Sequence, residues 1–286
     1  MNEKLVARLQ SPGPKRLLAL DGGGIRGVLT LEFLERIEAI LAGRSGKPEQ
    51  FRLSDYFDLI GGTSTGSIIA AMLACGRSVT EIKKLYEELA EKVFKRRLWR
   101  RRGVFVAKFP AKPLRDALEL YLGEKTTLGS DKILTGLMVM TKRLDTGSPW
   151  PLHNCPNGPF YDPDPWNSEA TANKDYLLAA IVRASTAAPS FFKPERISVA
   201  NKPNGEKVDG LFVDGGVSPS NNPALQLLML AALKGYGFLW PLGAENMLFV
   251  SVGTGSFPFK LQSCKVVAQT SSQCSTLLVE GAYRRL

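Results

Sequence analysis

The segment Gly62-Thr63-Ser64-Thr65-Gly66 has the residue types and spacing of a nucleophile elbow, the sharp strand-to-helix turn that exposes a catalytic serine. The strand-like run YFDLIGG leads into it and the helix-like run SIIAAMLA follows it, as this turn requires. The flanking positions must be glycine, because a side chain there would clash with the turn. Ser64 would lie at a helix N-terminus, whose dipole stabilises developing negative charge. Ser64 is therefore the candidate nucleophile, with a plain Gly/Ser turn as the alternative.

A serine nucleophile needs a general base, and the chain has one histidine, His153. A Ser-His-Asp triad would run Ser64, His153 and then a later acid, which is not the serine–acid–histidine order of α/β-hydrolases. His153 lies in the Pro-rich segment WPLHNCPNGP, where we expect a surface histidine without a catalytic role. The base is then a carboxylate or a lysine.

Asp214 is the strongest candidate for this base. It ends the strand-like run LFVD and is followed directly by Gly215 and Gly216. Functional groups gather beyond the carboxyl ends of parallel strands, so Asp214 and the elbow would share one edge of the sheet. Aspartate is a weak base, and a partly desolvated site that raises its pKa would help. The alternative for Asp214 is a turn-forming Asp-Gly pair. The competing acids are less well placed: Asp21, Asp58 and Asp209.

A third segment, Asp21-Gly22-Gly23-Gly24-Ile25-Arg26-Gly27, follows the strand-like run RLLAL and precedes a helix-like run. It satisfies the dinucleotide-binding fingerprint G-x-G-x-x-G. That fingerprint requires an acid at the end of the next strand to bind the ribose, and here that strand ends in GGTSTG. The favoured use of residues 22–27 is an oxyanion hole, in which free backbone N–H groups face the carbonyl oxygen of an ester.

The elements around these motifs predict a mainly parallel α/β sheet. Two strand–turn–helix units in succession, the first with apolar residues at helical spacing in VLTLEFLERIEAIL, favour parallel strands with crossover helices. No internal repeat or linker divides the chain. Further elements are expected in this order: helix 80–94, a strand ending near Met140, an irregular loop over 145–174, helix 176–185, strand 211–214, helix 223–233 and strand 248–252.

Composition and charge narrow the classes of protein and partner. With 286 residues, 44% hydrophobic and 22% charged, the chain is an ordinary globular protein with a sizeable core. A formal net charge of +10 favours nucleic acid, an anionic membrane surface or an acidic substrate, with a generally basic surface as the plain alternative. The four cysteines form neither a C-x-x-C pair nor a compact Cys/His cluster, so we expect no zinc site and no disulfide scaffold.

The N-terminal sequence lacks the apolar core of a signal peptide. The longest apolar region, 225–242, is interrupted by Lys234, Gly235 and Gly237 and is a poor membrane span. We therefore expect a cytoplasmic protein that meets membranes peripherally.

A cluster of cations follows the helix expected over 80–94. Its basic residues are Lys95, Arg96, Arg97, Arg100, Arg101 and Arg102, with Leu98 and Trp99 between them and no acid. We expect docking on anionic headgroups, to which each cation contributes about 1 kcal/mol, with Trp99 at the interface. The alternatives are a solvated surface that complements the helix dipole and, least favoured, a nucleic-acid site. No nucleic acid is expected as a partner.

Together, DGGGIRG (21–27), GTSTG (62–66) and DGG (214–216) resemble the motifs of the patatin-like phospholipase family, in the same order and at comparable separations. Softer matches follow in RASTAAPSFFKP (183–194), NNP (221–223) and SVGTG (251–255). The resemblance implies a three-layer α/β sandwich with a mainly parallel central sheet over residues 15–257. Residues 1–14 would be an N-terminal extension and 258–286 a C-terminal tail without a counterpart.

The resemblance also implies a chemistry. Ser64 would be the nucleophile and Asp214 the base of a dyad that hydrolyses acyl esters of phospholipids or related lipids through an acyl-enzyme. Residues 22–27 would form the oxyanion loop, and no histidine, metal or cofactor would take part. Two rival interpretations remain. The same dyad serves an esterase or thioesterase on soluble substrates, and a nucleotide- or lipid-binding module would use the glycine loops only to hold a ligand.

Overall fold

The computed structural model of this chain describes residues 3–89, 110–156, 158–163 and 167–255. The cationic cluster at 95–102 and the tail 258–286 lie outside these residues. The described strands are β1 (Lys15–Leu20), β2 (Leu59–Thr63), β3 (Gly136–Arg143), β4 (Pro149–His153), β5 (Glu195–Asn201), β6 (Lys207–Asp214) and β7 (Met247–Val252). The described α-helices are α1 (Glu3–Gln10), α2 (Gly27–Arg44), α3 (Leu53–Tyr56), α4 (Thr65–Ala74), α5 (Val79–Leu89), α6 (Lys112–Leu122), α7 (Leu178–Ser185) and α8 (Ala224–Ala232).

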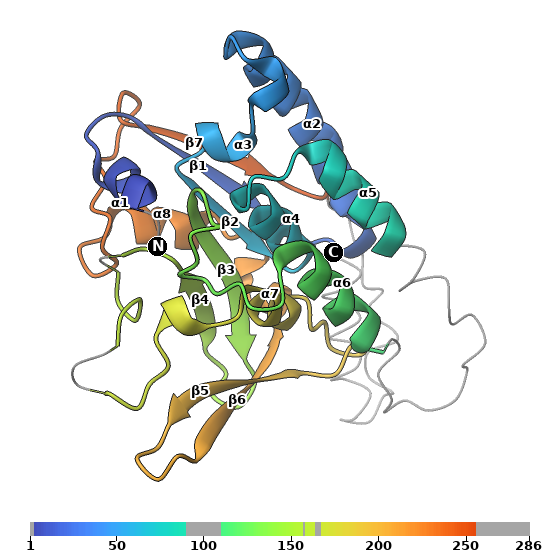
Figure 1. The fold of residues 1–286 in the computed structure, drawn as a ribbon, viewed down its shortest axis with the longest axis vertical. Coiled ribbons are helices and arrows are strands. Elements are labelled where there is room, and N and C mark those ends of the chain that lie inside the picture. Colours follow the sequence, from blue (N-terminus) through green and yellow to red (C-terminus); the bar gives the residue numbers. More distant parts are fainter. Residues whose placement is uncertain (1–2, 90–109, 157, 164–166, 256–286) are drawn as a thin grey trace, which may run out of the picture.

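The strands form one sheet in the order β5-β6-β3-β2-β1-β7, with β4 paired to β3 (Figure 1). Strands β7, β1, β2 and β3 run parallel, and Leu18 of β1 lies opposite Ile60 and Val250 of its two neighbours. Both faces of β1 and β2 are covered, which explains why these strands are nearly continuous apolar runs. The expectation of a mainly parallel three-layer α/β sandwich is confirmed.

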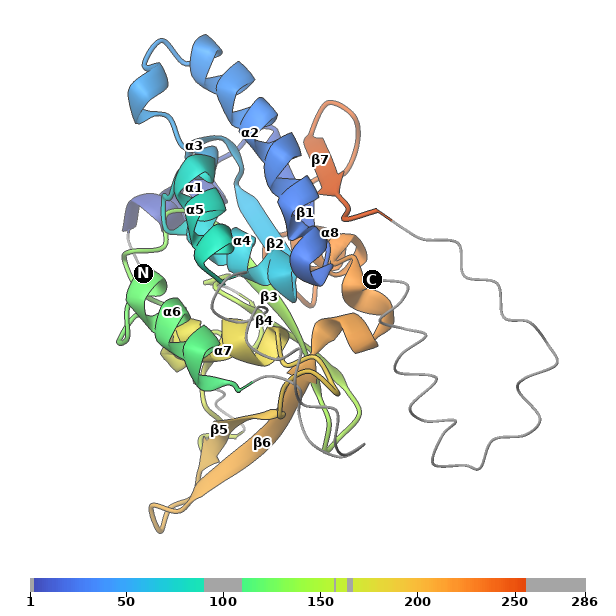
Figure 2. The same cartoon turned by 90° about the vertical axis from the view of Figure 1, so that its right-hand side faces the viewer.

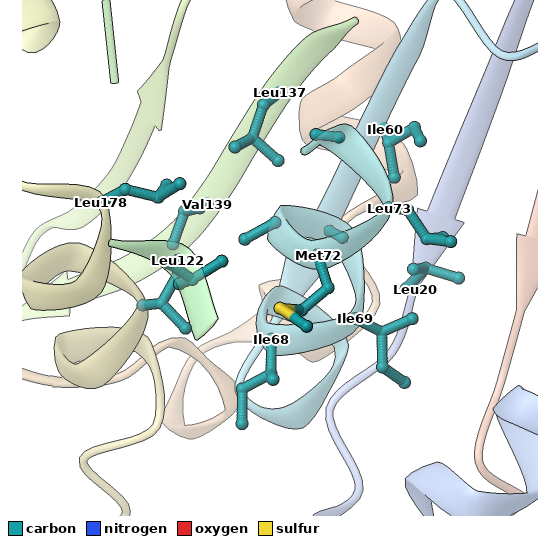
Figure 3. Packing of buried hydrophobic residues seen from close by; sticks show 14 of the residues in the cluster. Leu20, Ile60, Ile68, Ile69, Met72, Leu73, Leu122, Leu137, Val139 and Leu178 are labelled. Carbon is teal, nitrogen blue, oxygen red and sulfur yellow. The ribbon is translucent and has the colours of Figure 1, made fainter. Parts of the chain in front are cut away.

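Helices cover the two faces of the sheet (Figures 1 and 2). On one face, α4 packs against β2 and β3, α5 lies beside α2, and α6 lies beside α7. Every residue of α4 from Gly66 to Ala74 is buried, as expected of a helix that is apolar on all sides. Figure 3 shows Ile69 and Met72 of α4 in this core together with Leu20 and Val139. On the other face, α1 and α8 cover Leu17 and Leu59.

The strand β4 corrects the loop expected over 145–174. It pairs with β3 in the antiparallel direction, with Leu152 opposite Val139. Pro149 and Pro151 interrupt the alternating strand pattern in the sequence. Proline lacks the N–H group that a central strand needs, and β4 tolerates it because it is not flanked by a second described strand.

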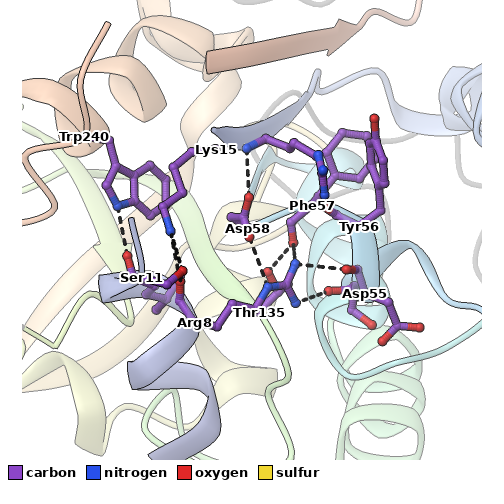
Figure 4. A network of polar contacts seen from close by, with 12 residues as sticks. Arg8, Ser11, Lys15, Asp55, Tyr56, Phe57, Asp58, Thr135 and Trp240 are labelled. Carbon is purple, nitrogen blue, oxygen red and sulfur yellow. Dashed lines mark hydrogen bonds and ion pairs between the residues drawn. The ribbon is translucent and has the colours of Figure 1, made fainter. Parts of the chain in front are cut away.

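The helix α1 packs against the sheet rather than extending from it. Leu5 and Leu9 are buried. The Arg8 guanidinium donates to Asp58 Oδ1 over 3.0 Å and to the carbonyl of Phe57, as Figure 4 shows. It also donates to the carbonyl of Ser54 in α3. Residues 3–10, within the segment expected as an extension, are therefore tied to the strand that leads into the elbow.

Candidate active site

Ser64 lies at the turn between β2 and α4 with a φ of 54° and a ψ of −124°. A positive φ is strained for a residue with a side chain and persists only where the surroundings impose it. A Cβ on Gly62 would lie 2.1 Å from the carbonyl oxygen of Gly66, and a Cβ on Gly66 would lie 2.3 Å from that of Leu20. Both glycines are therefore required by the close approach of backbone at this turn.

Ser64 and Asp214 are in direct contact. The Ser64 Oγ donates to Asp214 Oδ2 over 2.5 Å, and the Asp214 side chain is fully buried. The other carboxylate oxygen, Oδ1, accepts the N–H of Gly216 over 2.7 Å, which fixes the orientation of the carboxylate. The structure thus brings together the candidate nucleophile, the candidate base and the second glycine of the DGG motif.

Burial raises the pKa of Asp214 from its usual 3.8 to about 7, while the hydrogen bonds from Ser64 and Gly216 and the positive charge of Arg183 oppose that rise. A carboxylate with a pKa near neutrality is a stronger base than an ordinary aspartate and is still ionised at slightly alkaline pH. The arrangement can therefore remove a proton from the Ser64 hydroxyl.

The direction of β6 differs from the expectation. The sequence predicts a parallel strand that ends at Asp214 beside the elbow, but β6 pairs with β3 in the antiparallel direction. Asp214 still reaches Ser64, because it pairs with Thr141 while Thr63 pairs with the preceding residue, Met140. The base is in the expected place for a different reason.

The competing acids lie elsewhere. Asp58 precedes β2, at the opposite end from the elbow, and accepts hydrogen bonds from Arg8 and the N–H of Arg16. Asp209 is an exposed residue of β6 paired with Ser198. Burial raises the pKa of Asp21 to about 6, but its carboxylate has no hydrogen bond to Ser64.

The glycine loop leads from β1 into a short 3₁₀ helix, Gly24–Arg26, ahead of α2. The N–H of Gly22 donates to the carbonyl of Asn221, and the N–H of Gly23 donates to Thr65 Oγ1 over 3.1 Å. The N–H groups of Arg26 and Gly27 bond within the loop. Among the described residues the N–H groups of Gly24 and Ile25 have no acceptor. These two are the loop's free donors.

Ser64 and the glycine loop open into one cavity of about 740 Å³. Its wall is mainly apolar and comes from α2, α4, α5, α6 and the segment after α7: Val28, Leu31, Ile68, Tyr86, Leu89, Leu114, Ala188, Phe191 and Phe192. Ile25 and Val28 line the cavity and also reach solvent: 57% of the surface of Ile25 and 43% of the surface of Val28 are exposed. The cavity therefore suits an apolar group placed next to Ser64.

Sequence reasoning misses Arg183 and Ser185, which lie in the segment RASTAAPSFFKP at the end of α7. The Ser185 hydroxyl accepts the backbone N–H of Ser64 over 2.9 Å. Arg183 is fully buried, and its guanidinium lies 4.8 Å from the centre of the Phe192 ring. Its positive charge lowers the pKa of Asp214. Both residues lie in the segment 183–194, whose softer resemblance to the family's motifs is the one signal in the sequence that could have indicated a role for them.

His153 is not the surface residue that its Pro-rich surroundings suggest. It ends β4 with 3% of its surface exposed, and its Nδ1 accepts the N–H of Cys155 over 3.2 Å. Burial lowers the pKa of His153 to about 4, so the imidazole is neutral at pH 7. The expectation of an exposed loop is wrong, because pairing with β3 draws this segment into the sheet.

Within the described residues, no cluster of three or more His, Cys, Asp or Glu side chains has an arrangement that could hold a metal ion. None of the described helices has the length and apolar character needed to cross a membrane.

The model of the patatin-like phospholipase family matches residues 18–228. A cGAMP-activated phospholipase of Escherichia coli (strain TW11681) is 31% identical over 243 residues, which cover 84% of this chain and 62% of that protein. A cGAMP-activated phospholipase of Vibrio cholerae is 32% identical over 73% of this chain and 55% of its own length. Patatin-like protein 1 of Arabidopsis thaliana is 33% identical over 84% of this chain and 58% of its own length. The chain thus spans less than two thirds of the length of each of these relatives.

Proposed function

The chain belongs to the patatin-like phospholipase family, and we propose that it is a serine acyl hydrolase that cleaves fatty acyl esters of membrane phospholipids. The observation that carries the proposal is the hydrogen bond of 2.5 Å between Ser64 Oγ and Asp214 Oδ2, made at a strained turn that lines a mainly apolar cavity. Family membership supports an ester hydrolase, and the dyad supplies its nucleophile and base.

The reaction proceeds in two steps. Asp214 Oδ2 accepts the Ser64 hydroxyl proton as Oγ attacks the ester carbonyl, and the proton then passes to the departing alcohol. Water attacks the acyl-enzyme with Asp214 again as base, which releases the fatty acid and restores the serine. A positioned base of this kind contributes roughly 10²–10⁴ in rate. The free N–H groups of Gly24 and Ile25 would stabilise the oxyanion, for which one donor contributes about 3 kcal/mol.

The cavity supports a lipid as the substrate. Its mainly apolar wall offers an acyl chain a surface on which to pack, and Ser64 lies on that wall. Exposed Ile25 and Val28 at the margin would allow a chain to move between a membrane and the cavity over apolar surface.

A peripheral contact with an anionic membrane is part of the proposal. Leu89 and Leu114 both line the cavity, and the sequence between them carries the six cations and Trp99 of the cluster at 95–102. Cations so close in sequence to the cavity favour anionic headgroups as the docking partner.

The proposal is tested by fatty-acid release from mixed anionic phospholipid vesicles in EDTA. Two of the relatives are named as cGAMP-activated, so each assay is run with and without cGAMP. Ser64→Ala and Asp214→Asn are compared with wild type, and Asp209→Asn is the matched control because Asp209 is an exposed aspartate on the same strand. We expect release by wild type and Asp209→Asn and none by the two dyad variants.

Other results separate the rival functions. Hydrolysis of a p-nitrophenyl ester without release from vesicles would indicate an esterase or thioesterase on soluble substrates. Full release by Ser64→Ala would overturn the proposed nucleophile. If wild type cleaves neither substrate with or without cGAMP, the glycine loops belong to a binding module.

A further inference from the structure

The segment that ends α7 contacts both members of the candidate dyad. Ser185 Oγ accepts the backbone N–H of Ser64 over 2.9 Å, and the carbonyl of Ala187 accepts the backbone N–H of Asp214 over 3.1 Å. Ser64 and Asp214 are 150 residues apart in the sequence. Both are nevertheless tied to a single stretch of three residues, whose position therefore sets the distance between them.

The Ser185 hydroxyl is held on its other side by the sheet. It donates to the carbonyl of Met140 over 2.6 Å, and Met140 is the β3 residue paired with Thr63, which precedes Ser64. A hydroxyl has one proton to give, so the donation to Met140 leaves its oxygen as the acceptor for the Ser64 N–H. Ser185 is fully buried, so water cannot replace either bond.

The bond from Ser185 reaches Ser64 from outside the elbow. The carbonyl of Ser64 is bonded within the first turn of α4, where it accepts the N–H and the hydroxyl of Ser67. The N–H of Ser64 is bonded across the core, to α7. The positive φ of Ser64 must be imposed by such contacts, because an unconstrained serine would leave this conformation.

We infer that Ser185 is a positioning residue, whose side chain holds the backbone of Ser64 in the strained conformation that aims its Oγ at Asp214. Ala187 holds the backbone of Asp214 from the same segment. This inference rests on the proposed function, since it concerns the geometry of the Ser64–Asp214 pair. Loss of the Ser185 hydroxyl leaves a buried N–H and a buried carbonyl without partners and frees Ser64 to rotate.

The test compares Ser185→Ala and Ser185→Thr with wild type in two assays. One is kcat and KM on a soluble p-nitrophenyl ester, and the other is the rate at which a fluorophosphonate labels Ser64, followed by mass spectrometry of the peptide. Ser185→Ala should lower kcat and the labelling rate together by roughly 10- to 100-fold with KM nearly unchanged, as a small misplacement of a reacting group does. Ser185→Thr keeps the hydroxyl and should restore most of both rates.

The matched control is Thr135→Ala. Thr135 is fully buried and its hydroxyl donates to the carbonyl of Phe57 over 2.5 Å, at the other end of the sheet. This change removes a comparable bond and should lower stability without lowering kcat or the labelling rate. Equal kcat values and equal labelling rates in Ser185→Ala and Thr135→Ala would overturn the inference. If the alanine variant is isolated unfolded, Ser185→Cys keeps the size of the side chain but replaces the hydroxyl oxygen by a sulfur, which accepts the Ser64 N–H only weakly. A wild-type kcat in that variant would also overturn the inference.

The labelling assay separates this inference from the proposed function. If Ser64 of wild type is labelled but no fatty acid is released from vesicles, the lipid substrate is wrong, and the labelling rates still decide the role of Ser185. If Ser64 of wild type is not labelled and no ester is cleaved, the dyad and the role of Ser185 fall together.

Discussion

Thr63 and Asp214 occupy neighbouring positions along one edge of β3, since Thr63 pairs with Met140 and Asp214 pairs with Thr141. Met140 and Thr141 also pair with β4, which lies along the opposite edge of β3. Strands β2 and β6 therefore lie along the same edge of β3, and their C-terminal ends meet there. Both strands end at this point: β2 is followed by Ser64 and α4, and β6 is followed by Gly215 and Gly216 of the DGG motif. Two strands of opposite direction thus deliver the two groups to one point.

The buried Asp214 carboxylate should make the fold less stable at neutral pH than the Asp214→Asn variant. Burial raises its pKa to about 7, so between roughly pH 4 and 7 the folded protein keeps a proton that the unfolded chain has lost. The free energy of unfolding of wild type therefore falls as the pH rises, whereas asparagine does not titrate. At about 1.4 kcal/mol per pKa unit, the variant should gain up to about 4 kcal/mol on wild type between pH 4 and 8.

Urea denaturation of the two proteins across this pH range measures the gain. The raised pKa of Asp21, with the same sign of effect, is common to both proteins and cancels in the difference. A stability difference that does not change with pH would show that Asp214 is not buried as a titrating group.

The three motifs could be placed from the sequence because each follows a local steric rule. Gly62 and Gly66 are fixed by the backbone that crowds them, and the rule that requires glycine there holds wherever a strand turns sharply into a helix. The direction of β6 could not be predicted, because it depends on pairing with β3, and the run LFVD is equally apolar in either direction. The strand β4 could not be predicted either, because its prolines are unfavourable in a strand and only its pairing with β3 reveals it.

Ser185 shows the other limit of the sequence. Its partner Ser64 lies 121 residues away, and one serine in a small-residue segment carries no signal of such a bond. The spacing of Leu5 and Leu9, by contrast, is the i, i+4 pattern of an amphipathic helix, so the buried face of α1 was within reach of sequence reasoning.

Arg183 should set the acid limb of the pH–rate profile. Its charge lowers the pKa of the fully buried Asp214, as do the hydrogen bonds from Ser64 and Gly216. The guanidinium itself faces Glu195 and Arg115 as well as Asp214. Replacing it by methionine of similar length removes the cation, so the pKa of Asp214 should rise and the acid limb of kcat/KM on a soluble ester should move to higher pH.

The activity lost by Arg183→Met should therefore be greater at pH 6 than at pH 9. Arg115→Met is the control, since Arg115 pairs with Glu195 at the margin of this group and its side chain is half exposed. A uniform loss of activity at every pH in Arg183→Met would mean that Arg183 acts through packing alone.

His153 should be dispensable for hydrolysis but should limit acid stability. Burial lowers its pKa to about 4, so below pH 6.5 the unfolded chain binds a proton that the folded protein does not bind. The free energy of unfolding therefore falls as the pH falls. His153→Asn keeps an acceptor for the N–H of Cys155 and does not titrate. Its stability relative to wild type should rise by about 3 kcal/mol between pH 7 and 4, with kcat/KM within about twofold of wild type. A large loss of kcat/KM in a folded His153→Asn would return histidine to the mechanism.

The cationic cluster should govern membrane binding and not the chemistry of the dyad. Replacing its six basic residues by glutamine should weaken binding to anionic vesicles by more than about 100-fold, because each cation near the surface contributes about 1 kcal/mol. The control replaces six exposed cations from other parts of the chain and so carries the same net charge: Arg44, Lys47, Lys125, Lys202, Lys207 and Lys234. Cosedimentation with vesicles measures binding, and hydrolysis of a soluble ester by both variants should equal that of wild type. Equal weakening of vesicle binding in the two variants would assign the effect to overall charge, because a local docking surface would be affected by the loss of the cluster and not by the loss of the other six cations.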